Sequence, residues 1–523
     1  MRRPRRHVGA ALGPVGPASM LRARGGPGLS CGSRRVAGPS GRAYGGRVIP
    51  DPSSPSPPVR RKPLLGVLLA PLFAALVAVS VINVALAAIG EGLDADSGDL
   101  QWVISGYALA FGILLVPAGR AGDATGRRRM FIIGVGVFTL GSLLSGIAPT
   151  VEILNLSRIL QGIGSGLLNP QTVALIQQHF RGQDRARAFA LLATTVAVAT
   201  AIGPVLGGGL IQLLGPELGW RWMFLMNVPV GVVAIIGAFR YIPDDKLRSG
   251  RLPDLDPVGT VLLSAAILGI MLPFLERGVS PLVWLSFPAG LMVLGLWWAW
   301  EQRYRRRGRA PMVDTAIFAN RAFRNGILII SVYFLGATSV WIIIPLFLQM
   351  HLQHTAFEAA LIGLPSSAAA AISSQVAGRY VLTLGRRLVI VGFGIAFTSM
   401  LLTAIMSGFV ENGTLSFWWL AAPLTLMGLS QGMTISPNQT LTLNSMDPRF
   451  GGVAGGILQL GQRIGAAIGT AMIPGILFSL TESGTPWLEA FVIVVSIIMG
   501  LTLVAMGFSI ADRAREKQAP GAL

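Results

Sequence analysis

The chain has 523 residues, of which 52% are hydrophobic and only 12% are charged. Soluble proteins carry about 25% charged residues, and a single soluble core stops growing at about 250–300 residues. A soluble chain of this length would need a far more charged surface. The composition therefore excludes a disordered protein, a coiled coil and a soluble multidomain enzyme, and it indicates a polytopic membrane protein.

The formal net charge is +19, but the basic residues are not distributed as on a nucleic-acid-binding surface. Thirteen of the 42 lie in the first 62 positions, and nearly all the others fall in short segments between apolar runs. Short basic loops of membrane proteins face the cytoplasm. The charge therefore indicates topology, and we expect no nucleic-acid partner.

Patterns for catalysis and metal binding are missing from the sequence. Cys31 is the single cysteine, and His351 and His354 are the only histidines close together, without carboxylates at metal-ligand spacing. No nucleophile and base pattern and no phosphate-binding loop occurs. We therefore expect neither an enzyme nor a bound metal.

Residues 1–62 are rich in Gly, Pro, Arg and Ser and lack hydrophobic periodicity. Such a segment buries too little apolar surface to fold. We expect a disordered basic cytoplasmic tail, or upstream sequence translated from a wrongly assigned start. No apolar stretch typical of a signal peptide precedes Pro63.

A membrane-spanning helix needs about 20 mostly apolar residues. Fourteen such runs follow the tail, at 64–89, 101–118, 130–148, 152–173, 187–212, 222–240, 257–275, 281–300, 324–348, 357–377, 387–407, 416–437, 452–478 and 488–510. Basic residues concentrate in every second loop, and the loop after the first run holds only acidic charges. An even number of spans with both termini in the cytoplasm fits this asymmetry.

Two loops share a spacing of glycine and arginine. One reads GRAGDATGRRR from residue 119, and the other reads GRYVLTLGRR from residue 378. Glycines permit a tight reversal of the chain, and arginines bind carboxylates or helix C-terminal carbonyls. Leu382 stands where the first copy has Asp123, so only the first copy can form that ion pair. We expect both loops to act as gates, through Gly119, Asp123, Gly126, Arg127, Arg128, Gly378, Gly385 and Arg386.

With these loops and further motifs, the chain resembles the major facilitator superfamily, and within it the fourteen-span drug/proton antiporter family. RILQGIGSG from Arg158 is similar to the family's motif with a buried Arg and a Gln-Gly pair, and AIGPVLGG from Ala201 is similar to its antiporter signature. WRWMFLMNVPVG from Trp220 and PMVD at 311–314 are similar to its sixth-span entry and to the stretch before its ninth span. The resemblance covers residues 64–510.

The resemblance implies an all-α membrane protein with the major-facilitator fold and 14 transmembrane helices. Two six-helix halves, 63–240 and 323–510, are expected on either side of two extra helices and a cytoplasmic linker at 241–322, with a cytoplasmic tail at 511–523. It further implies export of a hydrophobic or amphipathic small molecule (a drug, an antibiotic or a secondary metabolite) by alternating access and proton antiport. The expected setting is a bacterial plasma membrane, with a proton gradient, a bilayer and a small-molecule substrate, a monomeric chain and no cofactor.

The antiporter-like segment also has a direct physical reading. Gly203 and Pro204 inside a predicted span kink the helix and free a backbone carbonyl. Gly207 and Gly208 are expected to let a neighbouring helix approach closely.

Charged side chains inside a bilayer cost about 2.5–3.5 kcal/mol on insertion scales, and two arginines, Arg158 and Arg463, fall inside predicted spans. Each needs carbonyls, water, an acidic partner or an anionic ligand. A polar but uncharged set is expected to line the substrate pathway and to suit a neutral or anionic amphiphile, although each member alone is more often an interhelical hydrogen bond. The set is Asn83, Tyr107, Gln161, Gln375, Gln431 and Asn438.

The first span departs from the family pattern. The family usually has an Asp several residues before an Asn-Val-Ala-Leu stretch, and this chain has Ala78 there. A carboxylate at that position is the natural proton carrier, so Asp123 and Glu358 remain as candidates for proton-linked switching. Three alternatives stay open: a lipid or lipid-linked flippase, an organic-anion facilitator that uses Arg158 and Arg463, and a non-transporting membrane sensor or interaction protein.

Overall fold

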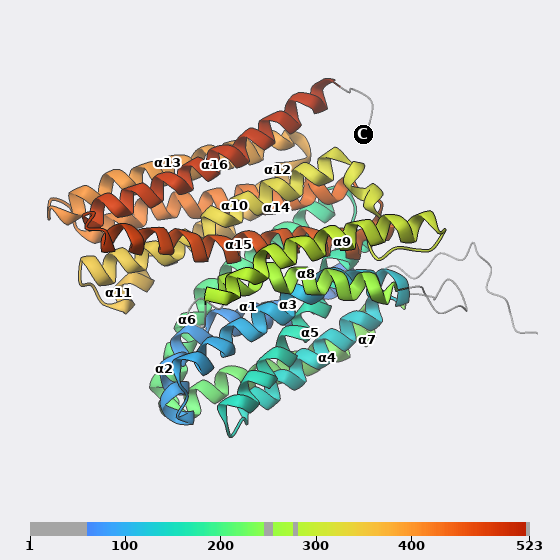
Figure 1. The fold of residues 1–523 in the computed structure, drawn as a ribbon, viewed down its shortest axis with the longest axis horizontal. Helices are drawn as coiled ribbons and strands as arrows, with labels where there is room; N and C mark the ends of the chain where they lie inside the picture. The colour runs from blue at the N-terminus through green and yellow to red at the C-terminus, as the bar shows by residue number, and fades with distance from the viewer. Residues whose placement is uncertain (1–59, 245–254, 276–280, 519–523) are drawn as a thin grey trace, which may run out of the picture. The chain divides into compact units, whose positions relative to one another are not determined.

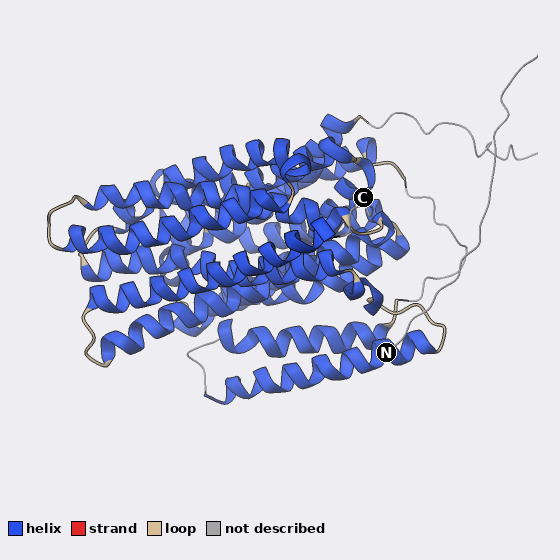
Figure 2. Cartoon of the chain, turned by 90° about the horizontal axis from the view of Figure 1, so that it is seen from above, coloured by secondary structure: helices blue, strands red, loops and turns tan. Residues whose placement is uncertain are grey.

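The computed structural model describes residues 60–244, 255–275 and 281–518. The expectations for most of the amino-terminal tail, for part of the linker and for the last five residues lie outside these ranges. Within them the chain is helix and loop with no strand (Figure 2). A helix pairs its backbone N–H and C=O groups internally, as a bilayer requires.

Seven helices build the amino-terminal half, coloured blue to green in Figure 1. They are α1 (Arg61–Ser80), α2 (Ile82–Leu93), α3 (Ser97–Thr125), α4 (Arg127–Gly146), α5 (Val151–His179), α6 (Gly182–Leu225) and α7 (Asn227–Tyr241). Helix α5 packs against α3 and α4, and α1 packs against α6 and α7. The first predicted span is divided between α1 and α2.

Helix α6 contains a sharp break. Its 44 residues would extend about 66 Å if straight, which is twice the thickness of a bilayer core. Gly215 has φ of 80° and ψ of 166°, a conformation that favours glycine, and Pro216 follows it. A Cβ atom on Gly219 would lie 2.6 Å from the Cα of Ile211, so the segment after the break folds back on the segment before it. The break therefore separates the two apolar runs that the sequence predicts at 187–212 and 222–240.

A helix pair separates the two halves along the chain. It consists of α8 (Pro257–Leu275), a 3-10 turn at Pro281–Leu285 and α9 (Ser286–Arg306). The two helices touch through glycines, because a Cβ on Gly269 would lie 2.9 Å from the Cα of Gly290. Helix α8 also packs against α3 and against α15 of the other half. The pair lies at the edge of the bundle in Figure 2.

The carboxy-terminal half is coloured yellow to red in Figure 1. Its main helices are α10 (Arg321–Leu346), α11 (Ala356–Leu361), α12 (Leu364–Leu384), α13 (Arg386–Glu411), α14 (Ala421–Asn444), α15 (Gly451–Glu482) and α16 (Trp487–Gln518). Short turns connect them at Thr315–Ala319, Phe347–His351, Phe417–Leu420 and Pro448–Phe450. Gly461, Gly465 and Gly469 of α15 form a stripe of small residues that all face α10, so this stripe is a packing surface.

Ten helical stretches of the described residues are long and apolar enough to cross a membrane, and one of them is the continuous Gly182–Tyr241 stretch. Every predicted span coincides with helix. Helices α5, α12 and α14 are not among these ten stretches. They hold polar side chains that are buried inside the bundle, such as Gln161, Ser374 and Thr434. The fold is therefore that of a multi-pass helical membrane protein.

Candidate functional site

The first gating loop contains a buried ion pair. Asp123, near the end of α3, accepts hydrogen bonds from Nε and Nη2 of Arg127 at 3.0 and 2.7 Å. Their side chains are only 4% and 8% exposed. The ion pair predicted for the first copy of the repeat is present.

Asp123 also joins the two halves. Its carboxylate accepts hydrogen bonds from the backbone N–H groups of Gly452 at 3.1 Å and Val453 at 3.0 Å. These N–H groups belong to the first turn of α15, where a helix has no internal acceptors and carries partial positive charge. Arg127 adds a 2.6 Å bond from Nη2 to the carbonyl of Pro448. The loop thus closes onto the opposite half through both members of the pair.

Helices α3 and α15 approach to backbone contact beside this pair. A Cβ atom on Gly119 would overlap the carbonyl oxygen of Gly452, and a Cβ on Gly452 would overlap that of Gly119. A Cβ on Gly456 would likewise overlap the carbonyl oxygen of Leu115. Glycine is required here because any side chain would separate the halves.

The second gating loop occupies the other seam between the halves. A Cβ on Gly378 would lie 2.5 Å from the Cβ of Ala190 in α6, and Nε2 of Gln183 donates a 2.8 Å hydrogen bond to the carbonyl of Gly378. Gly126 and Gly385, the second glycines of the two copies, have φ of 111° and 54°. Their positive φ explains the repeated glycine spacing.

Arg386 of the second loop is paired inside its own half. It is 1% exposed, and its Nε donates a 2.7 Å hydrogen bond to Asp512 of α16. Its Nη1 donates to Oδ1 of Asn438 at 2.5 Å, and Nδ2 of Asn438 donates to the carbonyl of Gly326 at 2.9 Å. Asn438 was expected in the substrate pathway, but it is fully buried and positions Arg386 instead. Asp512 was missed because it follows the last apolar run and resembles a tail residue.

Arg128 anchors α4 to the end of α7. Its Nη2 donates a 2.9 Å hydrogen bond to the carbonyl of Phe239, whose ring lies 5.6 Å from the guanidinium carbon. Its Nη1 lies 3.7 Å from Oδ1 of Asp244. Arg128 therefore contacts the amino-terminal half, and neither of these bonds crosses to the other half.

Arg158 lies in a closed polar network within the amino-terminal half. Its Nε donates a 3.0 Å hydrogen bond to the carbonyl of Val103, its Nη1 donates to Gln161, and its guanidinium carbon lies 4.4 Å from the centre of the Tyr107 ring. Gln161 in turn donates a 2.6 Å bond to Ser142. Carbonyl and amide oxygens thus accept hydrogen bonds from this buried cation, and no acidic side chain in the described part of the chain pairs with it.

Arg463 has a different environment. Its guanidinium carbon lies 4.6 Å from the centre of the Phe111 ring of α3, and Phe111 stacks on Tyr107 with ring centres 6.2 Å apart. Within the described ranges, Arg463 forms no hydrogen bond and no ion pair. Its side chain is half-buried. The two arginines predicted inside the spans therefore flank one aromatic pair. Among the described residues, Arg158 has hydrogen-bond partners for two of its nitrogens and Arg463 has none.

The remaining residues of the predicted pathway have different surroundings. Nε2 of Gln375 in α12 donates a 2.7 Å hydrogen bond to Thr194 of α6, which joins the halves. The hydroxyl of Tyr107 lies 2.7 Å from that of Ser165. Gln431 is half-buried on α14. The side chain of Asn83 lies outside the described part of the chain.

The antiporter-like segment of α6 packs against α1 and the residue that follows it. A Cβ on Gly203 would overlap the hydroxyl of Ser80, and a Cβ on Gly207 would lie 2.8 Å from Cγ2 of Val81. Gly208 faces open space, so the expectation of a close helix approach there was wrong. Pro204 lies within α6 between these contacts. Ala78 is fully buried in α1.

Acidic residues outside the gate have defined positions. Oε2 of Glu358 accepts hydrogen bonds from the N–H and hydroxyl of Thr355, both at 2.9 Å, as in a helix capping box.

Asp256 and Glu301 are fully buried beside Gly259 at one end of the α8–α9 pair. Oε2 of Glu301 has no hydrogen-bond partner among the described residues. Glu301 is therefore buried although it directly follows the apolar run 281–300.

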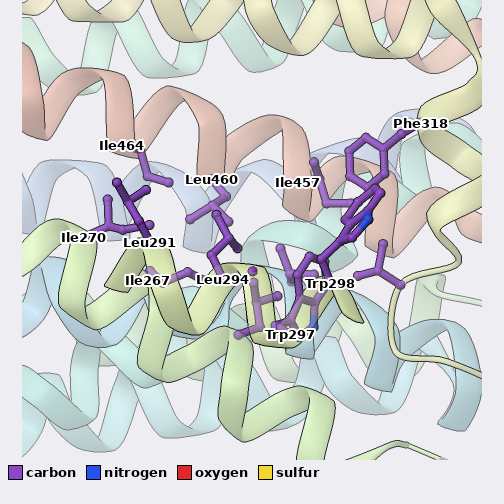
Figure 3. Close-up of a pocket in the computed structure, with 14 residues that line it drawn as sticks. Ile267, Ile270, Leu291, Leu294, Trp297, Trp298, Phe318, Ile457, Leu460 and Ile464 are labelled. Atoms are coloured by element: carbon purple, nitrogen blue, oxygen red, sulfur yellow. The ribbon is translucent and has the colours of Figure 1, made fainter. Parts of the chain in front are cut away.

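An apolar groove of about 540 Å³ lies between the α8–α9 pair, α3 and α15. Figure 3 shows Leu294 and Trp298 of α9 on the side towards Leu460 and Ile457 of α15, with Phe318 beside Trp298. Leu460 also packs against the cluster of Tyr107, Phe111 and Leu115. The groove and the aromatic pair beneath Arg463 therefore share Leu460 as a wall.

The sequence pattern of the Major Facilitator Superfamily matches residues 68–470. The chain is 31% identical to the probable actinorhodin transporter of Streptomyces coelicolor over 85% of its length and 76% of that protein. It is 31% identical to the puromycin resistance protein of Streptomyces alboniger over 75% of its length and 77% of that protein. A human organic anion transporter has the same fold, with a TM-score of 0.63, 14% identity, and coverage of 87% of this chain and 100% of that one.

Proposed function

The chain belongs to the Major Facilitator Superfamily, and from this membership we propose that it exports a hydrophobic or amphipathic small molecule, such as a drug, an antibiotic or a secondary metabolite. The bacterial relatives named for antibiotic transport and resistance support export. The single observation that carries a transport mechanism is the hydrogen bonding of Asp123 to the first turn of α15. A contact made of one charged pair and a few N–H groups can break and re-form during alternating access.

The arginine-rich end of the bundle, defined by residues 119–129 and 378–387, faces the cytoplasm in this proposal. The positive-inside rule supports that orientation. Arg61 pairs with Asp184, and Arg386 pairs with Asp512, so both ends of the described chain lie at this end. We also propose that the chain has fourteen membrane spans, is monomeric and lies in the bacterial plasma membrane.

Proton antiport is the energy source we propose. Ala78 removes the carboxylate that the family usually has in the first span. Asp123 stays a proton-carrying candidate, and we add the buried Glu301 to it. Glu358, the other candidate from the sequence, caps a helix through Thr355. Glu301 supports this role because one of its oxygens lacks a partner among the described residues, and an ionised carboxylate is costly to bury in that state.

Growth and accumulation in a bacterial host test the proposal. Cells that produce the chain, the Asp123→Asn variant or an empty vector would receive puromycin and a panel of amphipathic antibiotics. Export predicts lower accumulation and faster growth with the wild-type chain for at least one compound, and loss of both effects in the variant. Unchanged accumulation for every compound, with the protein present in the membrane, would contradict export. Higher accumulation would indicate an importer.

A further inference from the structure

Arg463 lies near the middle of the membrane-spanning part of α15. At 1.5 Å per residue, it lies about 18 Å along the helix from Gly451. Phe111, which its guanidinium contacts, lies in the middle of α3. The contact therefore lies between the halves, well away from the Asp123 gate.

A guanidinium has five N–H donors and remains charged in proteins. Arg158 donates hydrogen bonds from Nε to Val103 and from Nη1 to Gln161, and its ring contact is to Tyr107. Arg463 has a ring contact but none of its donors is engaged by a described residue. Unpaired charge at this depth is costly unless water or an anion reaches it, and Arg463 is partly exposed.

The face of Phe111 covers one side of the Arg463 guanidinium, which leaves its edges free to bind an anion. The planar fork of arginine matches carboxylate and phosphate oxygens in a bidentate way. No acidic side chain of the described ranges forms an ion pair with it. The site therefore has the chemistry of an anion receptor and lacks that of a cation receptor.

Apolar volume adjoins this cation. Leu460, one turn before Arg463 on α15, packs on the Tyr107–Phe111 cluster and also lines the groove of about 540 Å³. A volume of this size accepts a drug-sized apolar body. A compound with an acidic group at Arg463 could extend its apolar part past Leu460 towards Trp298.

We propose that the transported compound is an organic anion, that Arg463 binds its acidic group, and that its apolar body lies along Leu460. This inference rests on the proposed function for its physiological meaning. It gives Arg463 a ligand-binding role and Arg158 a structural role.

Three fluorescent compounds with one ring system test the inference by binding alone. Purified protein in lipid nanodiscs would be titrated with anthracene carboxylate, its methyl ester and anthracenylmethylammonium. We expect the carboxylate to bind at least about tenfold more tightly than the ester, because a charge-assisted hydrogen bond is lost in the ester. Arg463→Gln should remove that preference, and Arg463→Lys should retain part of it because lysine keeps the charge without the fork.

Arg324→Gln is the matched control, because Arg324 is an exposed arginine of α10 and its loss changes net charge equally. It should keep the wild-type preference. Equal binding of carboxylate and ester by the wild type, tighter binding of the ammonium, or a carboxylate preference that survives in both Arg463 variants would overturn the inference. Carboxylate selectivity in nanodiscs without any export in cells would leave the anion site intact and refute the proposed function instead.

Discussion

The carboxylate of Asp123 accepts a 3.0 Å hydrogen bond from the backbone N–H of Val453, which lies 330 positions further along the chain. This bond ties the last turn of α3 to the first turn of α15. Arg127 lies against the same carboxylate and also reaches the carbonyl of Pro448. The gate is therefore a connection between the halves as well as a pair within one loop.

Asp123→Asn should loosen the arginine-rich end. An amide keeps the size of the carboxylate but loses its negative charge. That charge interacts with Arg127 and with the positive end of α15, and its loss should cost the closed gate about 1–2 kcal/mol, or roughly tenfold in the closed-to-open ratio. The measurement is the rate at which a maleimide labels Val453→Cys in a chain with Cys31→Ser. Asp447→Asn, an exposed acid at the same end, is the control. Equal labelling rates in all three chains would contradict the gate.

Gly119→Ala should impair transport by preventing close contact of α3 and α15. The added methyl group would overlap the carbonyl oxygen of Gly452, and such overpacking costs about 1–3 kcal/mol. Gly136→Ala is the control because a Cβ there has no neighbour within 4 Å. Transport rates of the two variants, normalised to the protein in the membrane, give the comparison. A fully active Gly119→Ala protein would show that this contact is dispensable.

Arg386→Ala and Asp512→Ala should each destabilise the carboxy-terminal half. Removing one member of a buried ion pair costs about 3–5 kcal/mol because the other charge stays buried without a partner. The double variant Arg386→Met with Asp512→Leu should recover part of that loss. Thermal unfolding in detergent measures both effects, with exposed Arg387→Ala as the control. Single variants as stable as the control, or strictly additive losses in the double variant, would argue against the pair.

Gly295→Trp should fill the groove beside α15 and slow transport of bulky substrates. Gly295 lines the groove, and a Cβ there has no neighbour within 4 Å, so the helix itself tolerates the change. Gly500→Trp, at a similarly open position on α16, controls for adding an indole to the protein. Competition by a large and a small amphiphile in the same transport assay would separate the two variants. Identical behaviour of both would exclude the groove from the substrate path.

Local features of the fold were predictable from the sequence. Each apolar run forms helix because hydropathy and length act within one segment. The break after residue 212 was predictable because Gly215 and Pro216 separate two runs. The repeated glycine spacing also indicated positions of close packing, since Gly119 and Gly378 lie at the two seams between the halves.

Contacts between distant helices were not predictable, because they depend on how each helix is rotated about its axis. Asp512 lies past the last apolar run, and nothing local indicates that it pairs with Arg386. Asn438 resembled a pathway residue but bonds Arg386 and Gly326. Gly207 and Gly208 are adjacent in sequence, yet only Gly207 faces a neighbour.

The direction of transport tests the central claim most directly. Inside-out and right-side-out vesicles from producing cells would be given the same labelled amphiphile under an imposed proton gradient, with lumenal pH followed at the same time. The account predicts uptake into inside-out vesicles, accompanied by movement of protons out of the lumen, and loss of both signals in Asp123→Asn. Uptake only into right-side-out vesicles, or into neither kind, would contradict export.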